Sequence, residues 1–390
     1  MTISTNQTPI ETSPNLDTES PFDWQNCWYP VTFIQDFSND RLHRFSLYDE
    51  PLVLFRDQEG KIGCVSDRCS HRAAQLSEGQ LLNGKLECLY HGWQFNTQGE
   101  CVHIPQLAKD AKIPRNACIR SFPVVEHQGM IWIWTGKTQI DPQKLPNMDF
   151  LEQEGVFCVD TMIDLPADYT YLIENGVDPA HVPISHDRTE LGVKRASAAP
   201  LEMEIISVSN QGFQGQLRRM NNPNANWMQL HYIAPYLVWY DFNLDKFGKL
   251  GGLIIYFLPL GKNKTRVCVR RYGKNFFSRW FKLQPRWLEH IRQNKLLEED
   301  LFFILSQAAY IADSGKTIKD VFLPLKTADV FVLEYRKWLD KYGIDLPSYD
   351  GYTTAKRPEN PQSTPMTFDR YTRHTSRGDE ADVRYSCCRL

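Results

Sequence analysis

The order of hydrophobic and polar residues divides the chain into a strand-rich N-terminal part and a mixed C-terminal part. Short runs of β-branched and aromatic residues at 52–56, 62–65, 85–88 and 130–134 are separated by turn sequences that contain Asn, Asp and Gly. Runs of this length and spacing predict a small antiparallel β domain. Residues 137–148 then contain Pro and Asp, which predicts a connection to a second domain.

The second part combines a sheet with long helices. Apolar and polar residues alternate between residues 201 and 271, which predicts an antiparallel sheet. Residues 280–311 have apolar residues at helical spacing, and residues 327–342 predict a second amphipathic helix that ends at Gly343. The predicted fold class is therefore α+β. The predicted organisation is a disordered arm at 1–20, an antiparallel β domain at 21–140, a second domain at 150–345 and a tail at 346–390.

Composition and charge exclude some functions. The net charge of −3 gives no broad basic field for nucleic acid or anionic lipid. The most apolar stretch, residues 252–260, is far shorter than the roughly 18 residues that cross a bilayer. The polar first twenty residues do not have the pattern of a secretory signal. We therefore expect a cytoplasmic protein, or one bound at the surface of a membrane, without a transmembrane segment.

The chain has ten cysteines, and in a reducing compartment paired cysteines usually bind metal. The first candidate is Cys69-x-His71, followed after sixteen residues by Cys88-x-x-His91. These four ligands fit either a tetrahedral zinc ion or a Rieske cluster, in which the cysteines hold one iron and the histidines the other. The β context and the Gly-Trp pair after His91 favour the cluster. The isolated cysteines are predicted to be small buried hydrophobic residues, namely Cys27, Cys64, Cys101, Cys118, Cys158 and Cys268.

A second candidate metal site lies in the segment LIENGVDPAHVPISH, residues 172–186. His181 and His186 with one carboxylate would form the facial triad that binds Fe(II) and leaves positions open. On a regular helix, residues five apart point about 140° apart. The two histidines therefore converge only if a helix ends between them, and Pro183 is predicted to supply that break.

The third ligand must come from elsewhere in the chain. Asp300, in the sequence KLLEEDLFFILSQ, precedes apolar residues on the predicted long helix and is our candidate. Its neighbours Glu298 and Glu299 are predicted to form a solvated acidic face. Asp178 has two readings, a carboxylate that orients His181 or the N-cap of a helix that starts at Pro179. Both readings hold together without conflict, and Asp178 and Asn175 are the candidate catalytic residues.

These motifs resemble those of Rieske non-haem iron oxygenases, and in particular those of the pheophorbide a oxygenase group, which includes the Lls1-type cell-death suppressors and their cyanobacterial relatives. The resemblance extends over residues 24–343. Its markers are WYPV at 28–31, CSHRAAQLSEG at 69–79, YHGW at 90–93, IPQ at 104–106, the block at 174–186 and TADVFVLEYRKWLDKYG at 327–343, with DRYTRHT following at 369–375.

The sequence also departs from that group. Its members often carry a redox-active CxxC soon after the DRYxxH segment, whereas here the last cysteines are the adjacent Cys387 and Cys388. Adjacent cysteines do not easily form an unstrained disulfide, which argues against thiol regulation through a CxxC.

The resemblance implies a second domain of helix-grip (START/Bet v1-like) type, with an antiparallel sheet and a long C-terminal helix. It implies a Rieske [2Fe–2S] cluster, mononuclear Fe(II), O₂, an external ferredoxin or ferredoxin-type reductase as donor, and a homotrimer. In that trimer Asp178 would link a cluster histidine of one chain to His181 of the next. The chain has no flavin or nicotinamide motif of its own.

Three hypotheses for function remain open at this point. The first is oxygenation of a chlorophyll-derived tetrapyrrole, such as pheophorbide a or chlorophyllide a. The second is oxygenation of another hydrophobic ring, a sterol or an aromatic acid. The third is a Rieske protein that only transfers electrons or senses redox state. Residues 187–200 are a candidate lid. For the aromatic residues in the predicted sheet, the preferred interpretation is that they form its core, and the alternative is that they bind a pigment. These aromatic residues are Trp227, Tyr232, Tyr236, Trp239, Tyr240 and Phe242.

Overall fold

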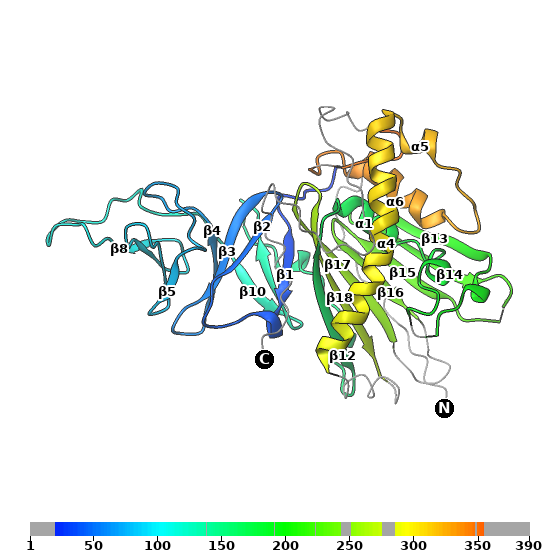
Figure 1. Cartoon of the computed structure of the whole chain (residues 1–390), viewed down its shortest axis with the longest axis horizontal. Helices are drawn as coiled ribbons and strands as arrows, with labels where there is room; N and C mark the ends of the chain where they lie inside the picture. The colour runs from blue at the N-terminus through cyan, green and yellow to red at the C-terminus, as the bar shows by residue number, and fades with distance from the viewer. Residues whose placement is uncertain are drawn as a thin grey trace.

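The computed structural model describes residues 20–137, 139–190, 192–222, 224–242, 251–274, 285–347 and 349–354. Figure 1 shows two parts side by side along the long axis of the molecule. The N-terminal part is made of strands and one 3-10 helix. These are β1 (Trp28–Phe33), η1 (Ile34–Asp36), β2 (His43–Leu47), β3 (Glu50–Arg56), β4 (Ile62–Ser66), β5 (Gln80–Leu82), β6 (Lys85–Glu87), β7 (Gln94–Phe95), β8 (Cys101–His103), β9 (Ser121–Phe122), β10 (Val124–His127) and β11 (Met130–Trp134).

These strands form three antiparallel sheets, with the orders β1-β11-β10, β2-β3-β4-β9 and β5-β6-β7-β8. The sheets enclose two separate groups of buried side chains. One group includes Val53, Phe55, Leu86 and Phe95 and surrounds the two cluster cysteines. The other contains β11, whose five residues are all buried, and continues into the C-terminal part. The loops that bear the metal motif are therefore supported by a small core of their own.

The C-terminal part contains one large sheet and the main helices. Its elements are η2 (Pro142–Lys144), η3 (Asp149–Glu152), β12 (Phe157–Leu165), α1 (Tyr169–Gly176), α2 (Val182–Ser185), η4 (Arg195–Ser197), β13 (Leu201–Ser209), β14 (Gly212–Arg219), β15 (Met228–Ile233), β16 (Leu237–Asp241), β17 (Gly251–Gly261), β18 (Lys264–Gly273), α4 (Arg286–Ser314), α5 (Ile318–Val321) and α6 (Val330–Tyr342).

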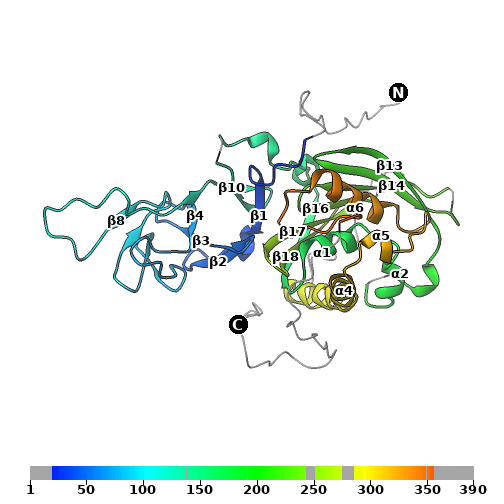
Figure 2. The ribbon, with the colours of Figure 1, turned by 90° about the horizontal axis from the view of Figure 1, so that it is seen from above.

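The large sheet has seven strands in the order β12-β18-β17-β16-β15-β14-β13, with all neighbours antiparallel. Because side chains alternate along a strand, Tyr232 and Tyr240 point to the same face from neighbouring strands. There Tyr232 packs on Trp338 of α6, and the Tyr240 hydroxyl donates to the Gly176 carbonyl at 3.0 Å. Helices α1, α4 and α6 lie on this face, with the long α4 running across the sheet (Figure 1), and Figure 2 shows the same arrangement from above.

Two arginines, Arg270 and Arg286, join the two parts. Arg270 on β18 binds Asp160 on β12 through two hydrogen bonds and donates a third to the carbonyl of Gln128 in the N-terminal part. Arg286, at the start of α4, donates to both carboxylate oxygens of Asp36, at 2.5 and 2.6 Å. Charge-assisted hydrogen bonds of this kind fix the relative orientation of the two side chains and also stabilise the contact between them. The start of α4 is thus tied to the N-terminal part.

The predicted α+β class is confirmed, with an antiparallel β domain followed by a helix-covered antiparallel sheet. The helix predicted at 327–342 is α6, and Gly343 is its C-cap. The prediction that the isolated cysteines are buried is wrong for Cys118, which is exposed, and only partly right for Cys158, which is half-buried. The remaining four are buried, because they lie on core-facing positions.

Some predictions lie outside the described residues. These are the arm at 1–19, the start of the predicted helix at 280–284, the segment 369–375 and the pair Cys387 and Cys388. The four domain boundaries stay predictions. Among the residues that the structure describes, no helix is both long and apolar enough to span a membrane.

Candidate metal centres

The four residues of the first motif lie on two similar turns. Cys69 N donates to the Ala74 carbonyl at 2.8 Å, and the Cys69 carbonyl accepts from Ala73 N at 2.9 Å. The second turn repeats this pattern, from Cys88 N to the Trp93 carbonyl at 2.9 Å and from Gly92 N to the Cys88 carbonyl at 2.8 Å. The fourth residue after each cysteine has a positive φ, 55° at Ala73 and 76° at Gly92. Two equivalent turns therefore present one cysteine and one histidine each.

The side chains on these turns converge. Cys69 and Cys88 are 3% and 2% exposed, and the rings of His71 and His91 lie 4.5 Å apart between centroids. His71 stacks on Trp93 at 4.6 Å, and its buried Nδ1 has no hydrogen-bond partner. Burial raises the pKa of the Cys69 thiol to about 11. A buried ring nitrogen without a partner is unfavourable unless it binds something, so the donor set fits a metal group at this position.

The spacing of the donors separates a single ion from a cluster. Zinc–ligand bonds of about 2.0–2.3 Å require all four donor atoms to lie close together. In the described part of the chain, the one group of three or more donor atoms within 4.8 Å of one another is His181, His186 and Asp300. The Cys69, His71, Cys88 and His91 donors are more widely spaced, which fits a two-iron cluster better than a zinc ion.

The two histidines of the second motif flank a short helix. α1 ends at Gly176, and α2 covers Val182–Ser185 with His181 and His186 as its two caps. The prediction that Pro183 breaks a helix between them is wrong. Pro183 lies in the first turn of α2, where proline is well tolerated because its missing N–H has no helical acceptor. The rings converge because neither histidine belongs to the regular part of a helix.

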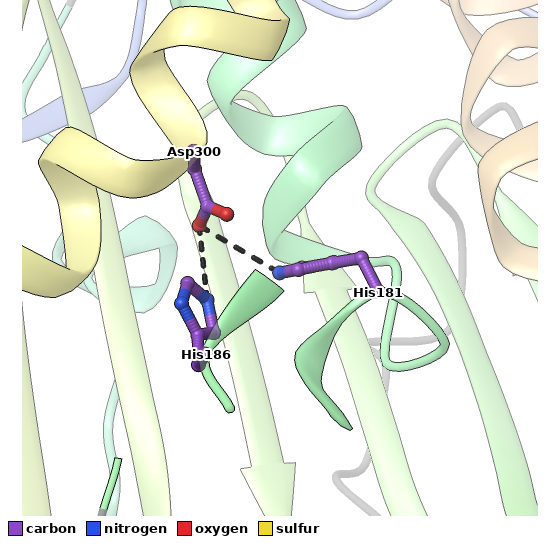
Figure 3. Close-up of side chains that lie close together, drawn as sticks. All are labelled: His181, His186 and Asp300. Carbon is purple, nitrogen blue, oxygen red and sulfur yellow. Dashed lines mark ion pairs between the residues drawn. The ribbon is translucent and has the colours of Figure 1, made fainter. Parts of the chain in front are cut away.

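Asp300 on α4 meets both histidines (Figure 3). Its Oδ2 atom lies 3.2 Å from Nε2 of His186 and 3.6 Å from Nε2 of His181. His186 is 3% exposed and Asp300 is 5% exposed. One carboxylate and two imidazoles are the ligand set of the facial triad that holds non-haem Fe(II). The structure thus brings together the three residues chosen from the sequence.

The electrostatics of this group are those of a cation site. Burial lowers the pKa of His181, but the nearby carboxylates of Asp178 and Asp300 outweigh burial and raise the pKa to about 10. Burial likewise raises the pKa of Asp300, but the two histidines outweigh it and the pKa is lowered overall. The site therefore favours a positive charge beside the ionised Asp300, which a proton on His181 or a bound metal cation would supply.

Asp178 is close to His181 but does not share a helix with it. Its Oδ1 accepts from Ala180 N at 2.8 Å, and its Oδ2 lies 3.4 Å from Nδ1 of His181. The reading of Asp178 as a helix N-cap before Pro179 is wrong, because the turn after α1 is not helical and α2 is capped by His181. Asn175 lies in the last turn of α1, and the contacts of the described residues place its side chain on none of the three triad members.

Two acidic residues near the site were not recognised from the sequence. The prediction that Glu299 lies on a solvated face is wrong, since its side chain is 16% exposed and lies 3.2 Å from Nδ1 of His186. Glu298 is exposed, as predicted. Glu174, the first residue of the second motif, is buried and pairs with Arg336 of α6. No local signal in the sequence could reveal the pair of Glu174 and Arg336, because these residues lie 162 positions apart.

The aromatic residues of the sheet are mainly core. Tyr232, Tyr236 and Tyr240 are buried, whereas Phe242 is 37% exposed. Trp239 lies on the opposite face from Tyr240 and stacks on His231 at 4.3 Å. The core reading is thus confirmed for the three tyrosines. The segment 187–200 contains turns and η4, and its role as a lid stays a prediction.

Comparisons with known proteins agree with this arrangement. Residues 27–123 match the Rieske [2Fe-2S] domain family, and residues 232–317 match the family described as pheophorbide a oxygenase. The first range contains the four residues of the paired turns, and the second contains Asp300. The block with His181 and His186 lies between them.

The chain is 40% identical to Protein TIC 55 of Arabidopsis thaliana, over 87% of this chain and 64% of that protein. It is 32% identical to the pheophorbide a oxygenase of Arabidopsis thaliana, over 95% of this chain and 75% of that protein. It thus spans somewhat less than two thirds of TIC 55. The fold is similar to that of dicamba monooxygenase bound to dicamba, with a TM-score of 0.67, 22% identity, and coverage of 82% of this chain and 98% of that one.

Proposed function

Because this chain belongs to the pheophorbide a oxygenase family of Rieske oxygenases, we propose that it oxygenates a hydrophobic ring substrate, in the first place a chlorophyll-derived tetrapyrrole. The observation that carries this proposal is the group of His181, His186 and Asp300, which a simple electron carrier would not need. The finer choice of pheophorbide a or chlorophyllide a rests on the family and on the named relatives. Their names place those relatives in chloroplasts, and we propose that this chain also works beside photosynthetic membranes.

The cofactors are a Rieske [2Fe–2S] cluster and a mononuclear iron. Cys69 and Cys88 would hold one cluster iron and His71 and His91 the other, and the triad would hold the single iron. When bound, these groups supply one-electron transfer and the activation of O₂. The protein contributes position and environment, because fixed ligands and a buried site exclude water and hold the geometry.

Asp178 is our candidate for the link between the two centres. Its Oδ1 is held by Ala180 N, which leaves Oδ2 directed at Nδ1 of His181. A carboxylate at this position orients the imidazole so that Nε2 faces Asp300. The same carboxylate could accept a hydrogen bond from a cluster histidine of another copy. For Asn175 the structure supports no more than a place in the turn before Asp178.

Electrons must enter from a partner. Leu89 and Tyr90, on the turn that carries His91, are 60% and 63% exposed, and the Tyr90 and His91 rings lie 4.0 Å apart. Exposed apolar residues beside a redox group favour a protein contact. We propose that this turn meets the triad of the next copy in a homotrimer, and that a ferredoxin or ferredoxin-type reductase supplies the electrons.

A second substrate class stays open. The identity to TIC 55 exceeds the identity to pheophorbide a oxygenase, so family membership does not by itself fix the ring that is oxidised. The alternative is another hydrophobic ring, such as a sterol or an aromatic acid. The alternative of a pure electron-transfer or redox-sensing protein is disfavoured by the buried triad.

The test is an oxygenation assay with labelled O₂. The protein is reconstituted with iron and sulfide without oxygen, reduced through a ferredoxin, and mixed with pheophorbide a and ¹⁸O₂. Mass spectrometry that finds label in the pigment would support the tetrapyrrole reaction. An unlabelled pigment, with cluster and mononuclear iron both loaded, would exclude pheophorbide a and move the proposal to the second substrate class.

A further inference from the structure

His186 is held from both edges of its ring by two consecutive residues of α4. Asp300 Oδ2 lies 3.2 Å from Nε2, and Glu299 Oε2 lies 3.2 Å from Nδ1. Consecutive helical residues point about 100° apart, so one stretch of α4 reaches both ring edges. The imidazole has therefore little freedom to rotate or to exchange its two nitrogens.

Glu299 is itself fixed by the segment that follows His186. The Thr189 hydroxyl donates to Oε1 of Glu299 at 2.7 Å, while Thr189 N donates to the His186 carbonyl at 3.1 Å. Both carboxylate oxygens of Glu299 are thus used, one by the ring and one by the hydroxyl. The result is a closed set of contacts from α4 to His186, to Thr189 and back to α4.

A second contact supports the same segment. Arg271 on β18 donates two hydrogen bonds to the carboxylate of Glu190, at 2.9 and 2.8 Å, and a third to Gln293 of α4 at 3.0 Å. Glu190 N in turn donates to the His186 carbonyl at 3.2 Å. The turn after His186 is therefore attached to both the sheet and α4.

The chemistry of the pair assigns the proton. A carboxylate only accepts hydrogen bonds, and a neutral imidazole has one N–H and one lone pair. A metal bound through the lone pair of Nε2, on the side of Asp300, would leave the N–H on Nδ1, where Glu299 Oε2 lies 3.2 Å away and accepts it. Glu299 is not itself a member of the triad, because it lies at the opposite edge of the ring.

We propose that Glu299 is a positioning residue that holds His186 with Nδ1 protonated and Nε2 free to bind the mononuclear iron. This inference rests on the proposed function of the triad. It distinguishes the two histidines, because Nδ1 of His181 lies 3.4 Å from Asp178 without a hydrogen bond of good geometry, whereas Nδ1 of His186 has one to Glu299. Carboxylates that orient metal-bound histidines commonly change metal affinity by roughly 10–100-fold.

The test is the affinity for ferrous ion, measured without oxygen by competition with a coloured chelator. Glu299→Ala is compared with Glu298→Ala, a change to the exposed neighbour on the same helix. We expect Glu299→Ala to bind iron roughly 10–100-fold more weakly, and Glu298→Ala to stay within about threefold of wild type. Glu299→Gln, which keeps an acceptor oxygen, should recover part of the loss, and Thr189→Val should show a smaller loss of the same kind.

The visible spectrum of the [2Fe–2S] cluster and the thermal midpoint of the iron-free protein report whether each variant is folded. If a folded Glu299→Ala protein binds iron as tightly as Glu298→Ala, the positioning role is wrong while the triad stands. If replacing Asp300 with Ala leaves the iron affinity at the wild-type value, the assignment of the triad is wrong, and so is the inference that rests on it. If Glu299→Ala does not fold, Thr189→Val decides, and wild-type affinity in that variant overturns the proposal.

Discussion

Arg336 on α6 donates a hydrogen bond from Nε to Glu174 on α1, and the two side chains are 0% and 9% exposed. Arg336 also donates from Nη1 to the Asp350 carbonyl at 2.6 Å, and Gln307 on α4 lies 3.5 Å from Glu174. The pair therefore joins α1 to α6, and the Gln307 contact joins α1, which leads to His181, to α4, which carries Asp300. Burial raises the pKa of Glu174, so the arginine is needed to keep the carboxylate charged.

Replacement of Arg336 should strongly destabilise the protein. Arg336→Met leaves the Glu174 carboxylate buried without its cation, which costs about 3–5 kcal/mol. The free energy of unfolding from urea denaturation tests this, with Lys337→Met, a change at the exposed next position, as control. The double variant Glu174→Gln/Arg336→Met should recover part of the loss, because no buried charge remains. Equal stability of Arg336→Met and Lys337→Met would show that the pair does not stabilise the fold.

The stability of the protein should also fall in mild acid because of His231. Burial lowers the pKa of His231 from its ordinary 6.5 to about 4. The unfolded chain then binds a proton near pH 6.5 that the folded chain does not bind until near pH 4, so stability decreases as the pH falls through this window. Between pH 7 and pH 5 the loss is about 2 kcal/mol.

His231→Phe keeps the stack on Trp239 and removes the titration. Urea denaturation at both pH values should therefore show a smaller acid loss for this variant, by about 2 kcal/mol. The other titrating groups are common to both proteins and cancel in the difference. An identical acid loss in the two proteins would mean that His231 takes up its proton in the folded state near its ordinary pKa.

Gly92 is predicted to be essential for the second cluster turn. Its φ is +76°, and a Cβ there would lie 2.8 Å from Pro105. Gly92→Ala should therefore reduce the fraction of protein that holds the cluster, read from visible absorbance and acid-labile sulfide. Gly60→Ala is the matched control, because Gly60 has φ +86° but nothing within 4 Å of its would-be Cβ. That variant should lose about 1–2 kcal/mol of stability and no cluster. Full cluster content in Gly92→Ala would contradict the close approach to Pro105.

The sequence predicted the fold well where local pattern decides structure. The strand 130–134 and the end of α6 at Gly343 follow from β-branched runs and from a C-cap glycine. Cys69, His71, Cys88 and His91 were recognisable because their spacing is short and specific. Asp300 was chosen from the acidic residues of one helix with the help of the apolar residues that follow it.

The remaining errors arise from tertiary contacts. Pro183 was expected to break a helix. The helix α1 instead ends earlier, at Gly176, where the Tyr240 hydroxyl donates a hydrogen bond to the Gly176 carbonyl. Glu299 was expected to be exposed to solvent because the sequence Glu298-Glu299-Asp300 does not indicate which acidic residue faces inward. In the folded protein, Glu299 lies beside His186. The role of Glu174 depends on Arg336, and no sequence period relates two such distant positions.

Asp178→Asn should separate electron transfer from metal binding. Asparagine keeps an oxygen that can accept from Ala180 N but loses the negative charge 3.4 Å from Nδ1 of His181. Stopped-flow reoxidation of the reduced cluster, with substrate and O₂ present, should slow by roughly 10–100-fold, while the iron content stays at the wild-type level. Asp313→Asn, an exposed change on α4, should leave the rate unchanged. A wild-type rate in Asp178→Asn would remove Asp178 from the proposed link.

The most direct test of the account is a single turnover of the reduced, iron-loaded protein with pheophorbide a and ¹⁸O₂, after the electron donor has been removed. The account predicts labelled pigment from the wild-type protein and none from Asp300→Ala, although that variant keeps its cluster spectrum. Equal label in both proteins would contradict the claim that oxygenation takes place at His181, His186 and Asp300.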